Sequence, residues 1–245
     1  AAADFDGAGG LDFLVRISGP GGVFPFSSYL ETRLLTDDGI GGFVNQGSVL
    51  PPGVDLNELG LFGNGEAVAA FEVDGDGDLD LVNNADVWTQ GPDGTFDGPT
   101  PFVVAGLTLS GFVRYQVLDV DDDPELELLA VTNSLDDLFV VDRLPGGALS
   151  ASLLYTAVGD IELPVTSADL GEGPERELIF TDNVNSALGR VVVLPATSGG
   201  FGPAVVLPTD PSDLRNVGVD DVDGDGFVDL LVGAIDGGGR GELLV

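Results

Sequence analysis

The 245-residue sequence has no cysteine, histidine, lysine or methionine, and these absences limit its chemistry. A chain without cysteine forms no disulfide and has no thiol nucleophile. Without histidine and lysine it also lacks an imidazole base and an amine for Schiff-base chemistry. Carboxylates, tyrosines and arginines remain, and no carboxylate pair stands apart from the motifs described below. We therefore predict a protein that is not an enzyme.

Positive charge is also scarce. The chain carries 42 acidic residues against eight basic ones, all of them arginine, and its formal net charge is −34. Such a field repels nucleic acid and anionic lipid, so neither is expected as a partner. No apolar run approaches the roughly 18 residues that a membrane-spanning helix needs. The start at Ala1-Ala2-Ala3, with no initiator methionine, predicts a secreted chain from which a signal peptide has been removed.

The most informative motif spans residues 221–229, Asp-Val-Asp-Gly-Asp-Gly-Phe-Val-Asp. Carboxylates occupy positions 1, 3, 5 and 9 of this segment, and glycines occupy positions 4 and 6, where the backbone must turn back on itself. Alternate side chains can direct their oxygens inward, and the carbonyl group of position 7 can add another. Calcium takes six to eight oxygen ligands at about 2.3–2.6 Å, so the motif predicts a calcium loop.

The same nine-residue frame recurs four times upstream. We call the segments loops 1 to 5, and they begin at residues 4, 72, 119, 169 and 221. Loop 2 nearly repeats loop 5. Loop 3 has Pro124 at position 6, loop 1 has Ala8 at position 5, and loop 4 keeps only the outer acids Asp169 and Glu177. The intervals of 68, 47, 50 and 52 residues indicate a repeat architecture.

Short apolar runs separated by Gly, Pro, Asn and Asp lie between the loops, and no stretch has a helical period. The chain is therefore predicted to be all-β, with four strands per unit and a loop between the first and second strands. In the second unit the strands are expected at residues 67–71, 79–83, 86–90 and 101–105. In the fourth unit they are expected at residues 165–168, 177–181, 190–194 and 203–207.

A repeated four-stranded antiparallel sheet is the unit of a β-propeller. We predict a single β-propeller domain, residues 1–245, of about five blades. The blades are expected at about residues 1–65, 66–109, 110–160, 161–212 and 213–245. Residues 55–64 account for the extra length of the first blade. The last blade has sequence for only three strands, so one edge is expected to be unpaired.

The pattern Asp-x-Asp-Gly-Asp-Gly-x-x-Asp-Leu resembles the FG-GAP repeat, also called the VCBS-type repeat, of integrin α-subunit propellers and many secreted bacterial proteins. The resemblance extends over essentially the whole chain, because the five loops are spread along it. It implies a propeller with one calcium ion per intact loop, about two to four ions in this chain. Propellers of this family most often have seven blades, whereas this chain has five units.

The resemblance also implies the calcium ligands, which are the side chains at positions 1, 3, 5 and 9 and the backbone carbonyl of position 7. They are Glu72, Asp74, Asp76, Asp78 and Asp80 in loop 2; Asp221, Asp223, Asp225, Phe227 and Asp229 in loop 5; Asp119, Asp121, Asp123, Glu125 and Glu127 in loop 3; and Asp4, Asp6, Gly10 and Asp12 in loop 1. Loop 4 has glycines at two inner positions. Metal binding and a metal-free turn both stay open there, and in the second case Arg176 neutralises a neighbouring acid.

Two other interpretations compete with the calcium loops. Solvated Asp-Gly turns are common in acidic β proteins, but they would not repeat a frame of acids at positions 1, 3, 5 and 9 before an apolar strand. An EF-hand requires Glu at position 12, where loop 5 has Val232 and loop 2 has Asn83.

The leading functional hypothesis is a secreted, calcium-stabilised, non-enzymatic β-propeller. A divalent ion turns the repulsion between neighbouring carboxylates into a cross-link between strands, and open loops of this kind suit extracellular calcium. The protein would serve as an adhesion or binding module, or as a subunit of an extracellular or cell-surface assembly. Its partners would be other protein subunits, in a homo-oligomer or filament formed through the unpaired edge strand, or an extracellular glycan or protein ligand.

A carbohydrate-binding, lectin-like propeller is the main alternative, and it would need exposed aromatic platforms. Trp88, Phe96 and Phe102 gather once, in the second unit, and packing between sheets is favoured for Trp88. An enzyme that acts on polysaccharide through paired carboxylates is a further alternative and is less favoured.

Overall fold

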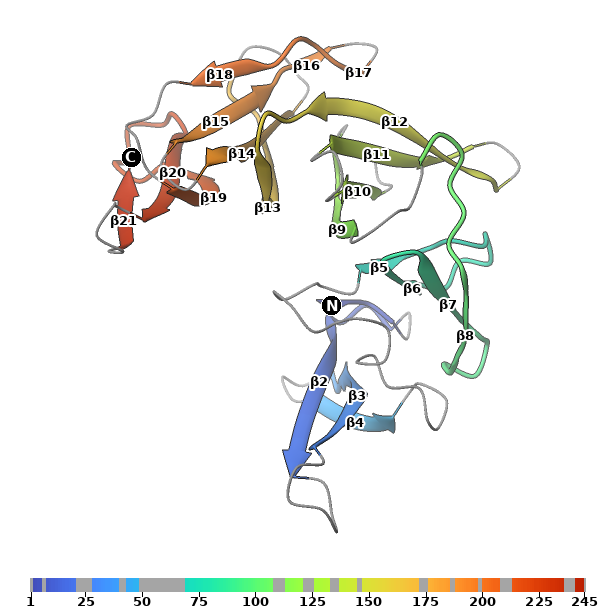
Figure 1. The fold of residues 1–245 in the computed structure, drawn as a ribbon. Helices are drawn as coiled ribbons and strands as arrows, with labels where there is room; N and C mark the ends of the chain where they lie inside the picture. The colour runs from blue at the N-terminus through green and yellow to red at the C-terminus, as the bar shows by residue number, and fades with distance from the viewer. Residues whose placement is uncertain are drawn as a thin grey trace. The chain divides into compact units, whose positions relative to one another are not determined.

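The computed structural model of the chain is all-β, as predicted (Figure 1). It describes residues 2–5, 8–20, 28–39, 43–48, 69–107, 113–120, 126–132, 137–144, 147–171, 176–185, 188–197, 200–207, 213–235 and 241–244. Within these ranges no helix is long and apolar enough to span a membrane. The predicted surface loop at residues 55–64 lies outside the described residues.

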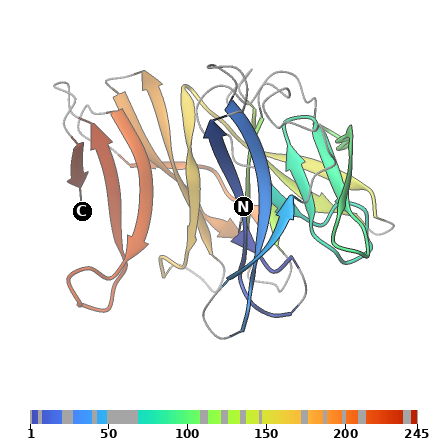
Figure 2. The same ribbon diagram turned by 90° about the horizontal axis from the view of Figure 1, so that it is seen from below.

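The strands form five antiparallel sheets in succession along the chain (Figure 2). Sheet 1 contains β1 (Ala2–Ala3), β2 (Asp12–Pro20), β3 (Ser28–Asp37) and β4 (Phe43–Ser48); sheet 2 contains β5 (Ala69–Phe71), β6 (Asp80–Asn83), β7 (Asp86–Gln90) and β8 (Phe96–Pro101); sheet 3 contains β9 (Val113–Leu118), β10 (Glu127–Thr132), β11 (Asp137–Arg143) and β12 (Leu149–Thr156). Sheet 4 contains β13 (Asp160–Ala168), β14 (Glu177–Asn185), β15 (Leu188–Leu194) and β18 (Val205–Leu207); sheet 5 contains β19 (Asp213–Asp220), β20 (Asp229–Ile235) and β21 (Gly241–Leu244). A two-stranded hairpin, β16 (Ala196–Thr197) with β17 (Gly200–Phe201), makes a sixth small sheet.

Each of the five loops connects the first strand of its sheet to the second. This placement confirms the prediction made from the repeated motif. The apolar residues after each ninth position form the second strand, because it runs through the interior of its sheet between two neighbours. Sheet 5 has three strands among the described residues, in agreement with the shorter last unit.

The predicted fourth strand of sheet 2, at residues 101–105, is wrong. Strand β8 covers Phe96–Pro101 instead. The turn before it is tight, since Gly94 N donates to Gly91 O at 2.8 Å and Gly91 N donates to Thr95 O at 2.7 Å. The chain therefore returns to the sheet at once, and Phe96, which is 1% exposed, pairs with Gln90.

Strand β13 is longer than the four residues predicted at 165–168, because it already begins at Asp160. Pro164 lies within it, and proline cannot donate a backbone hydrogen bond to the ladder. The register shifts between Glu162 and Thr166, so a bulge accommodates the proline and the strand continues.

Among the described residues, hydrophobic cores lie between sheets 3 and 4 and between sheets 4 and 5. The core between sheets 3 and 4 contains Leu129, Val131 and Leu138 from sheet 3, and Leu178, Phe180 and Val192 from sheet 4. The core between sheets 4 and 5 contains Ile179, Val191 and Val193 from sheet 4, and Leu214, Val217 and Val232 from sheet 5. Sheet 4 is thus buried on both faces.

Side chains alternate between the faces of each second strand. We call the face toward the preceding sheet the front face and the face toward the following sheet the rear face. Counted from the start of a loop, position 10 lies on the front face, as Leu178 does, and position 11 lies on the rear face, as Leu129 and Ile179 do. The same positions can therefore be compared from sheet to sheet.

Hydrogen bonds between first strands repeat in the same register. Gln116 Nε2 donates to Val165 O at 2.7 Å, and Val165 N donates to Gln116 Oε1 at 2.7 Å. Thr166 Oγ1 donates to Val217 O at 2.9 Å. Gln116 and Thr166 occupy equivalent positions before loops 3 and 4, and Val165 and Val217 occupy equivalent positions before loops 4 and 5. The sequence repeat therefore also repeats the hydrogen bonds that connect neighbouring sheets.

The chain divides into two compact units, residues 1–103 with 144–149, and residues 104–143 with 150–245. Sheets 1 and 2 belong to the first unit, whereas sheets 4 and 5 and nearly all of sheet 3 belong to the second. That the five sheets form one domain stays a prediction.

Candidate metal centre

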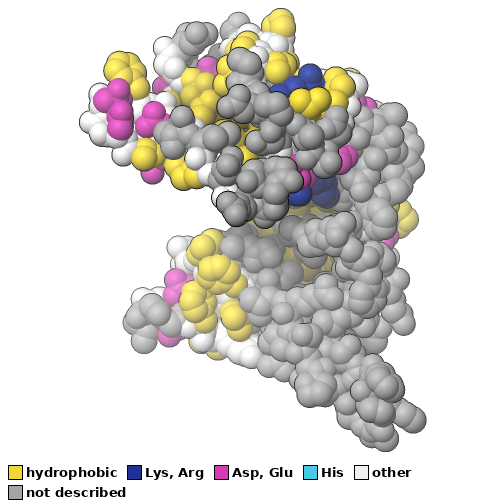
Figure 3. Space-filling model, turned by 60° about the vertical axis from the view of Figure 1, so that its left-hand side comes forward, with side chains coloured by type: hydrophobic (Ala, Val, Ile, Leu, Met, Phe, Trp, Pro, Cys, Tyr) yellow, Lys and Arg dark blue, Asp and Glu magenta, His cyan; other side chains and the backbone are white. Residues whose placement is uncertain are grey.

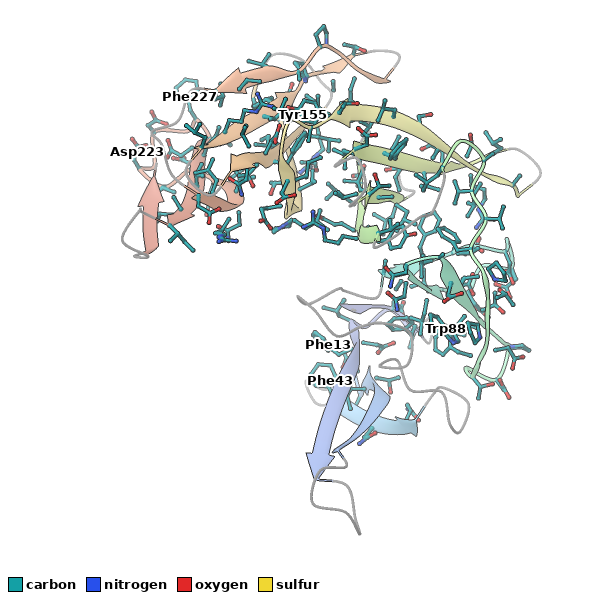
Figure 4. All side chains as sticks on the ribbon, in the orientation of Figure 1. Phe13, Phe43, Trp88, Tyr155, Asp223 and Phe227 are labelled. Carbon is teal, nitrogen blue, oxygen red and sulfur yellow. The ribbon has the colours of Figure 1, made fainter. Side chains whose placement is uncertain are left out.

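Loop 5 brings together three of its predicted ligands. Asp221, Asp223 and Asp229 each offer a carboxylate oxygen, and these oxygens lie within 4.8 Å of one another. Asp223 and Phe227 mark this loop in Figure 4. The backbone folds around the first acid, because Asp221 Oδ1 accepts from Gly224 N at 2.7 Å and Asp221 Oδ2 accepts from Gly226 N at 2.9 Å. Three converging carboxylates could hold a metal ion.

Loop 2 forms the same cluster from Glu72, Asp74 and Asp80, again within 4.8 Å. Glu72 Oε1 accepts from Gly75 N at 2.6 Å. The fifth-position acid belongs to neither cluster. Asp76 Oδ1 instead accepts from Asp78 N at 2.9 Å, and Asp225 Oδ1 accepts from Phe227 N at 2.8 Å. Coordination by Asp76 and Asp225, and by the carbonyl groups of Asp78 and Phe227, stays a prediction.

Glycines let both loops turn as the sequence predicts. Position 4 has φ of 92° at Gly75 and 76° at Gly224, and position 6 has φ of 97° at Gly77 and 89° at Gly226. Residues with a Cβ rarely adopt this left-handed conformation. The two glycines are therefore required by the backbone path that gathers the carboxylates.

The ninth-position acid closes every loop by accepting a hydrogen bond from the backbone N–H of position 2. The pairs are Phe5 N to Asp12 Oδ2 at 2.8 Å, Val73 N to Asp80 Oδ2 at 2.8 Å, Val120 N to Glu127 Oε2 at 2.9 Å, Leu170 N to Glu177 Oε2 at 2.9 Å, and Val222 N to Asp229 Oδ2 at 3.0 Å. Loop 4 keeps this bond although its inner acids are replaced. The ninth position thus has a structural role that does not depend on metal.

Two of these acids also reach the third strand of their sheet. Asp80 Oδ1 accepts from Gln90 N at 2.8 Å, and Asp12 Oδ1 accepts from Asp37 N at 2.8 Å. Asp80 is 0% exposed. Burial raises the pKa of Asp80 to about 6, the charges of Asp74 and Glu72 add to the rise, and the hydrogen bonds from Gln90 and Val73 oppose it. A bound cation would favour the ionised carboxylate.

Loop 1 retains part of the predicted geometry. Asp4 Oδ2 accepts from Gly9 N at 2.9 Å, which matches the bond from Gly226 to Asp221 in loop 5. A Cβ added at Gly10 would lie 2.6 Å from the Cβ of Asp37, so only glycine fits at this position. The predicted ligand Asp6 lies outside the described residues.

Loops 3 and 4 are described only in part. Asp119 and Glu127, the first and last residues of loop 3, are described. Its other predicted ligands, Asp121, Asp123 and Glu125, lie outside the described residues. In loop 4 the left-handed residue is Gly171 at position 3, with φ of 86°, and its N–H donates to Asp169 Oδ1 at 2.7 Å. Arg176 donates from Nη2 to Ser167 O at 2.9 Å, so an acid neutralised by Arg176 stays a prediction.

The sequence interpretation missed a buried polar cluster at the joint between sheets 3 and 4. Asp182 is 0% exposed, and its carboxylate accepts from Tyr155 Oη at 2.8 Å, from Gly159 N at 3.0 Å and from Arg190 Nη2 at 2.5 Å. Burial and the Asp182 carboxylate raise the pKa of Tyr155 to about 12, so its hydroxyl stays protonated as a donor. The available signal was Asp182, an acid that follows the apolar run 178–180 in strand β14.

A cavity of about 300 Å³ lies between sheets 4 and 5 and is lined by Gly159, Asp160, Glu162, Asn183, Val184, Asp213 and Arg215. Two of its three acids are paired with its arginine. Arg215 Nη2 lies 2.5 Å from Asp213 Oδ2, and Arg215 Nη1 lies 3.7 Å from Glu162 Oε1. The pair with Glu162 links sheet 5 to sheet 4, whereas Asp213 lies on the same strand as Arg215.

The three aromatic residues considered for carbohydrate stacking are buried. Trp88 is 0% exposed, Phe96 is 1% exposed and Phe102 is 3% exposed. Trp88 lies within sheet 2 in Figure 4, on strand β7. The prediction that Trp88 is a core residue is confirmed, and these three residues offer no surface platform to a sugar.

No family model matches the chain, and no match was found among curated proteins or solved structures. The resemblance to FG-GAP repeats therefore stays a prediction that depends on the residues of the loops.

Proposed function

We propose that the chain is a calcium-stabilised β-propeller without catalytic activity. In particular, it serves outside the cell as an adhesion or binding module, or as a subunit of an extracellular assembly. Its partners are other protein subunits or an extracellular glycan or protein ligand.

The propeller architecture is supported by the regular order of the sheets. In each sheet the strands pair antiparallel in chain order, except that β16 and β17 intervene before β18 in sheet 4, and the loop lies between the first and second strands. Sheets 3 and 4 share an apolar core, and so do sheets 4 and 5. A stack of such units, each contacting its neighbours, is how blades of a propeller bury their faces.

The observation that carries the metal assignment is the convergence of three carboxylates in loop 2 and again in loop 5. Hard cations such as calcium prefer carboxylate and carbonyl oxygens. The clusters contain no nitrogen or sulfur ligand, because the chain has no histidine or cysteine. Each ion would link the end of a first strand to the start of the second, and so stabilise the folded chain by linkage.

The extracellular location is supported by the openness of the loops. Loop 5 is exposed from Asp221 to Val228, and exposed calcium sites suit the millimolar calcium found outside cells. We favour an adhesion or structural role because the chain lacks histidine, lysine and cysteine and has a formal net charge of −34. Acidic and apolar side chains lie side by side on the surface drawn in Figure 3.

Calcium titration by calorimetry, combined with thermal melting in calcium and in EGTA, tests the proposal. We expect binding at two sites or more and a lower melting temperature in EGTA. At a free calcium concentration of 100 times Kd, each site stabilises the fold by about 2.7 kcal/mol. The variants Asp74→Asn and Asp223→Asn should each remove one site.

The matched control is Asp97→Asn, an exposed acid on strand β8 outside the loops. It should leave both the calcium stoichiometry and the melting difference unchanged. Equal melting temperatures in calcium and EGTA for the parent chain, with no heat of binding, would rule out the calcium assignment.

A further inference from the structure

The cavity between sheets 4 and 5 lies at the end of these sheets that is away from loops 4 and 5. Strands β13 and β19 begin beside it, at Asp160 and Asp213, and lead into the loops at their other ends. Strand β14 follows loop 4 and lies beside both of them (Figure 1), and near its end Asn183 and Val184 line the cavity. Every lining residue belongs to the second compact unit, so the cavity is formed within one unit.

Close contacts hold the walls of the cavity in place. A Cβ added at Gly159 would lie 1.9 Å from the backbone oxygen of Asn183, so only glycine fits where the chain enters β13. The Asn183 side chain is buried, and it donates from Nδ2 to Leu214 O and accepts from Leu214 N at 3.0 Å. These two hydrogen bonds connect sheet 4 to sheet 5. The cavity is therefore preformed, which lowers the entropic cost of binding a ligand.

Glu162 lies between two arginines and is hydrogen-bonded to neither. Its Oε1 lies 3.7 Å from Arg215 Nη1, and its Oε2 lies 3.8 Å from Arg114 Nη1. Both distances exceed the roughly 3.2 Å at which N–H···O hydrogen bonds end. Within the described part of the chain, the carboxylates of Glu162 and Asp160 accept no hydrogen bond. The cavity therefore presents unused acceptors next to the guanidinium of Arg215.

The charge of the cavity selects among classes of ligand. Three acids and one arginine line it, and the chain carries a net charge of −34, so an anion is repelled. A cation would lie beside Arg215, which already pairs with Asp213 at 2.5 Å. A neutral hydroxyl group both donates and accepts, so adjacent hydroxyls can accept from Arg215 and donate to Asp160 and Glu162. A neutral ligand with adjacent hydroxyls therefore fits this lining best.

We infer that this cavity binds a neutral sugar residue of a glycan, through hydrogen bonds from Arg215 and to Asp160 and Glu162. A sugar ring also presents C–H groups, and Val184, which is 37% exposed, offers them an apolar contact. The volume of about 300 Å³ is at the lower end for ligand cavities and suits one sugar residue. The inference rests on the proposed function in one respect, because it selects a glycan among the extracellular partners named there.

Saturation-transfer NMR tests the class of ligand, because it detects small molecules that bind weakly. The probes are the methyl glycosides of glucose, galactose, mannose and xylose, with methyl glucuronide as the anionic comparison and L-arginine amide as the cationic one. At about 50 mM probe, a site with a Kd of about 1 mM is nearly filled. We expect a signal from at least one neutral glycoside and a weaker signal or none from the charged probes.

Two variants remove the proposed contacts one at a time. Asp160→Asn replaces a carboxylate acceptor, and Arg215→Lys keeps the charge but loses the planar fork of donors. Each should weaken glycoside binding about tenfold, the loss expected for one hydrogen bond to a charged group. Asp97→Asn is the matched control, because Asp97 is an exposed acid on strand β8 that does not line the cavity. It should bind the glycoside as the parent chain does.

Cysteine labelling locates the binding site, since the chain has no other thiol. N-ethylmaleimide on Val184→Cys places a bulky adduct at the wall of the cavity and should abolish glycoside binding. Val205→Cys is the matched control, because Val205 is a 47% exposed valine on strand β18 of the same sheet and does not line the cavity. Its adduct should leave binding unchanged. The glycoside should slow the labelling of Val184→Cys alone.

The outcomes separate this inference from the proposed function. No signal from any neutral glycoside, in a protein that binds calcium and melts normally, overturns the sugar site and leaves the proposed function standing. Binding of the charged probes alone also overturns it, and so does glycoside binding that survives the adduct at position 184. Glycoside binding at the cavity in a chain that binds no calcium supports the sugar site and overturns only the calcium assignment, since loops 4 and 5 lie at the other end of the strands.

Discussion

Loops 2 and 5 have nearly the same nine residues, yet their ninth-position acids lie in different surroundings. Asp80 is 0% exposed and accepts hydrogen bonds from Val73 N and Gln90 N. Asp229 is half-buried, and it accepts from Val222 N in a bond that faces solvent. Both loops gather three carboxylates within 4.8 Å. The motif therefore determines that the carboxylates cluster. The neighbouring structure determines how much free energy an ionised carboxylate costs at the ninth position.

This difference separates two effects of a bound cation. In loop 5 an ion would mainly relieve repulsion between solvated acids, which is weak in water. In loop 2 it would also neutralise a carboxylate that has lost its hydration, and desolvated charge is much more costly. Metal binding should therefore be coupled more tightly to folding in loop 2 than in loop 5.

The largest difference in stability is expected between Asp80→Ala and Asp229→Ala. In EGTA, where no metal contributes, Asp80→Ala should lower the free energy of unfolding by about 3 kcal/mol, because two backbone N–H groups lose a charged acceptor in the interior. Asp229→Ala should cost about 1 kcal/mol, because water can replace its acceptor. Urea denaturation measures both values. Equal losses would show that burial of the ninth position does not matter.

Gly77→Ala and Gly226→Ala should each destabilise the protein, by the same amount in both loops and by less than Asp80→Ala does. Both glycines have positive φ and open space where a Cβ would lie, so the cost is backbone strain of about 1–2 kcal/mol in each loop. Gly218→Ala is the control, since a Cβ at this strand position also meets open space but φ is not positive. It should change stability by less than about 0.5 kcal/mol. A clearly larger loss at Gly77 would mean that packing, not strain, sets the cost.

The smallest expected effect is the change of stability with pH. The pKa of Asp80 is raised from 3.8 to about 6 in the folded protein, so the folded state binds a proton more tightly than the unfolded chain does. Without metal, the contribution of Asp80 to stability should therefore rise by about 1 kcal/mol as the pH falls from 7 to 5. Urea denaturation in EGTA should detect this rise in the parent chain and in Asp229→Asn. The rise should be missing in Asp80→Asn.

Much of the fold could be predicted, because the repeat supplied both a period and a frame. The loops lie between first and second strands as expected, and the strands after them begin at the ninth position. Strand β8 was misplaced because an apolar run at residues 101–105 outweighed the turn that ends at Gly94. Strand β13 was predicted too short, because a bulge at Pro164 is a property of the paired sheet and has no signal in a single strand.

The site could be predicted less completely. Positions 1, 3 and 9 converge in loops 2 and 5, whereas coordination by the fifth-position acids Asp76 and Asp225 stays a prediction. The ninth-position hydrogen bond was not foreseen, although loop 4 keeps its outer acid after losing the inner ones. The cluster around Asp182 was also missed, because its partners Tyr155 and Arg190 come from two different strands.

The sequence by itself determined the local chemistry of this protein. The spacing of acids and glycines sets the loops, since a left-handed glycine and a side-chain acceptor act over a few residues. Tertiary structure alone decided how deeply each copy of the motif is buried. Sheet packing buries Asp80 and leaves Asp229 half-buried, and it buries Leu129 and Ile179 more completely than Leu231. Burial depends on neighbours about 50 residues away in the chain, so similar motifs acquire different energies.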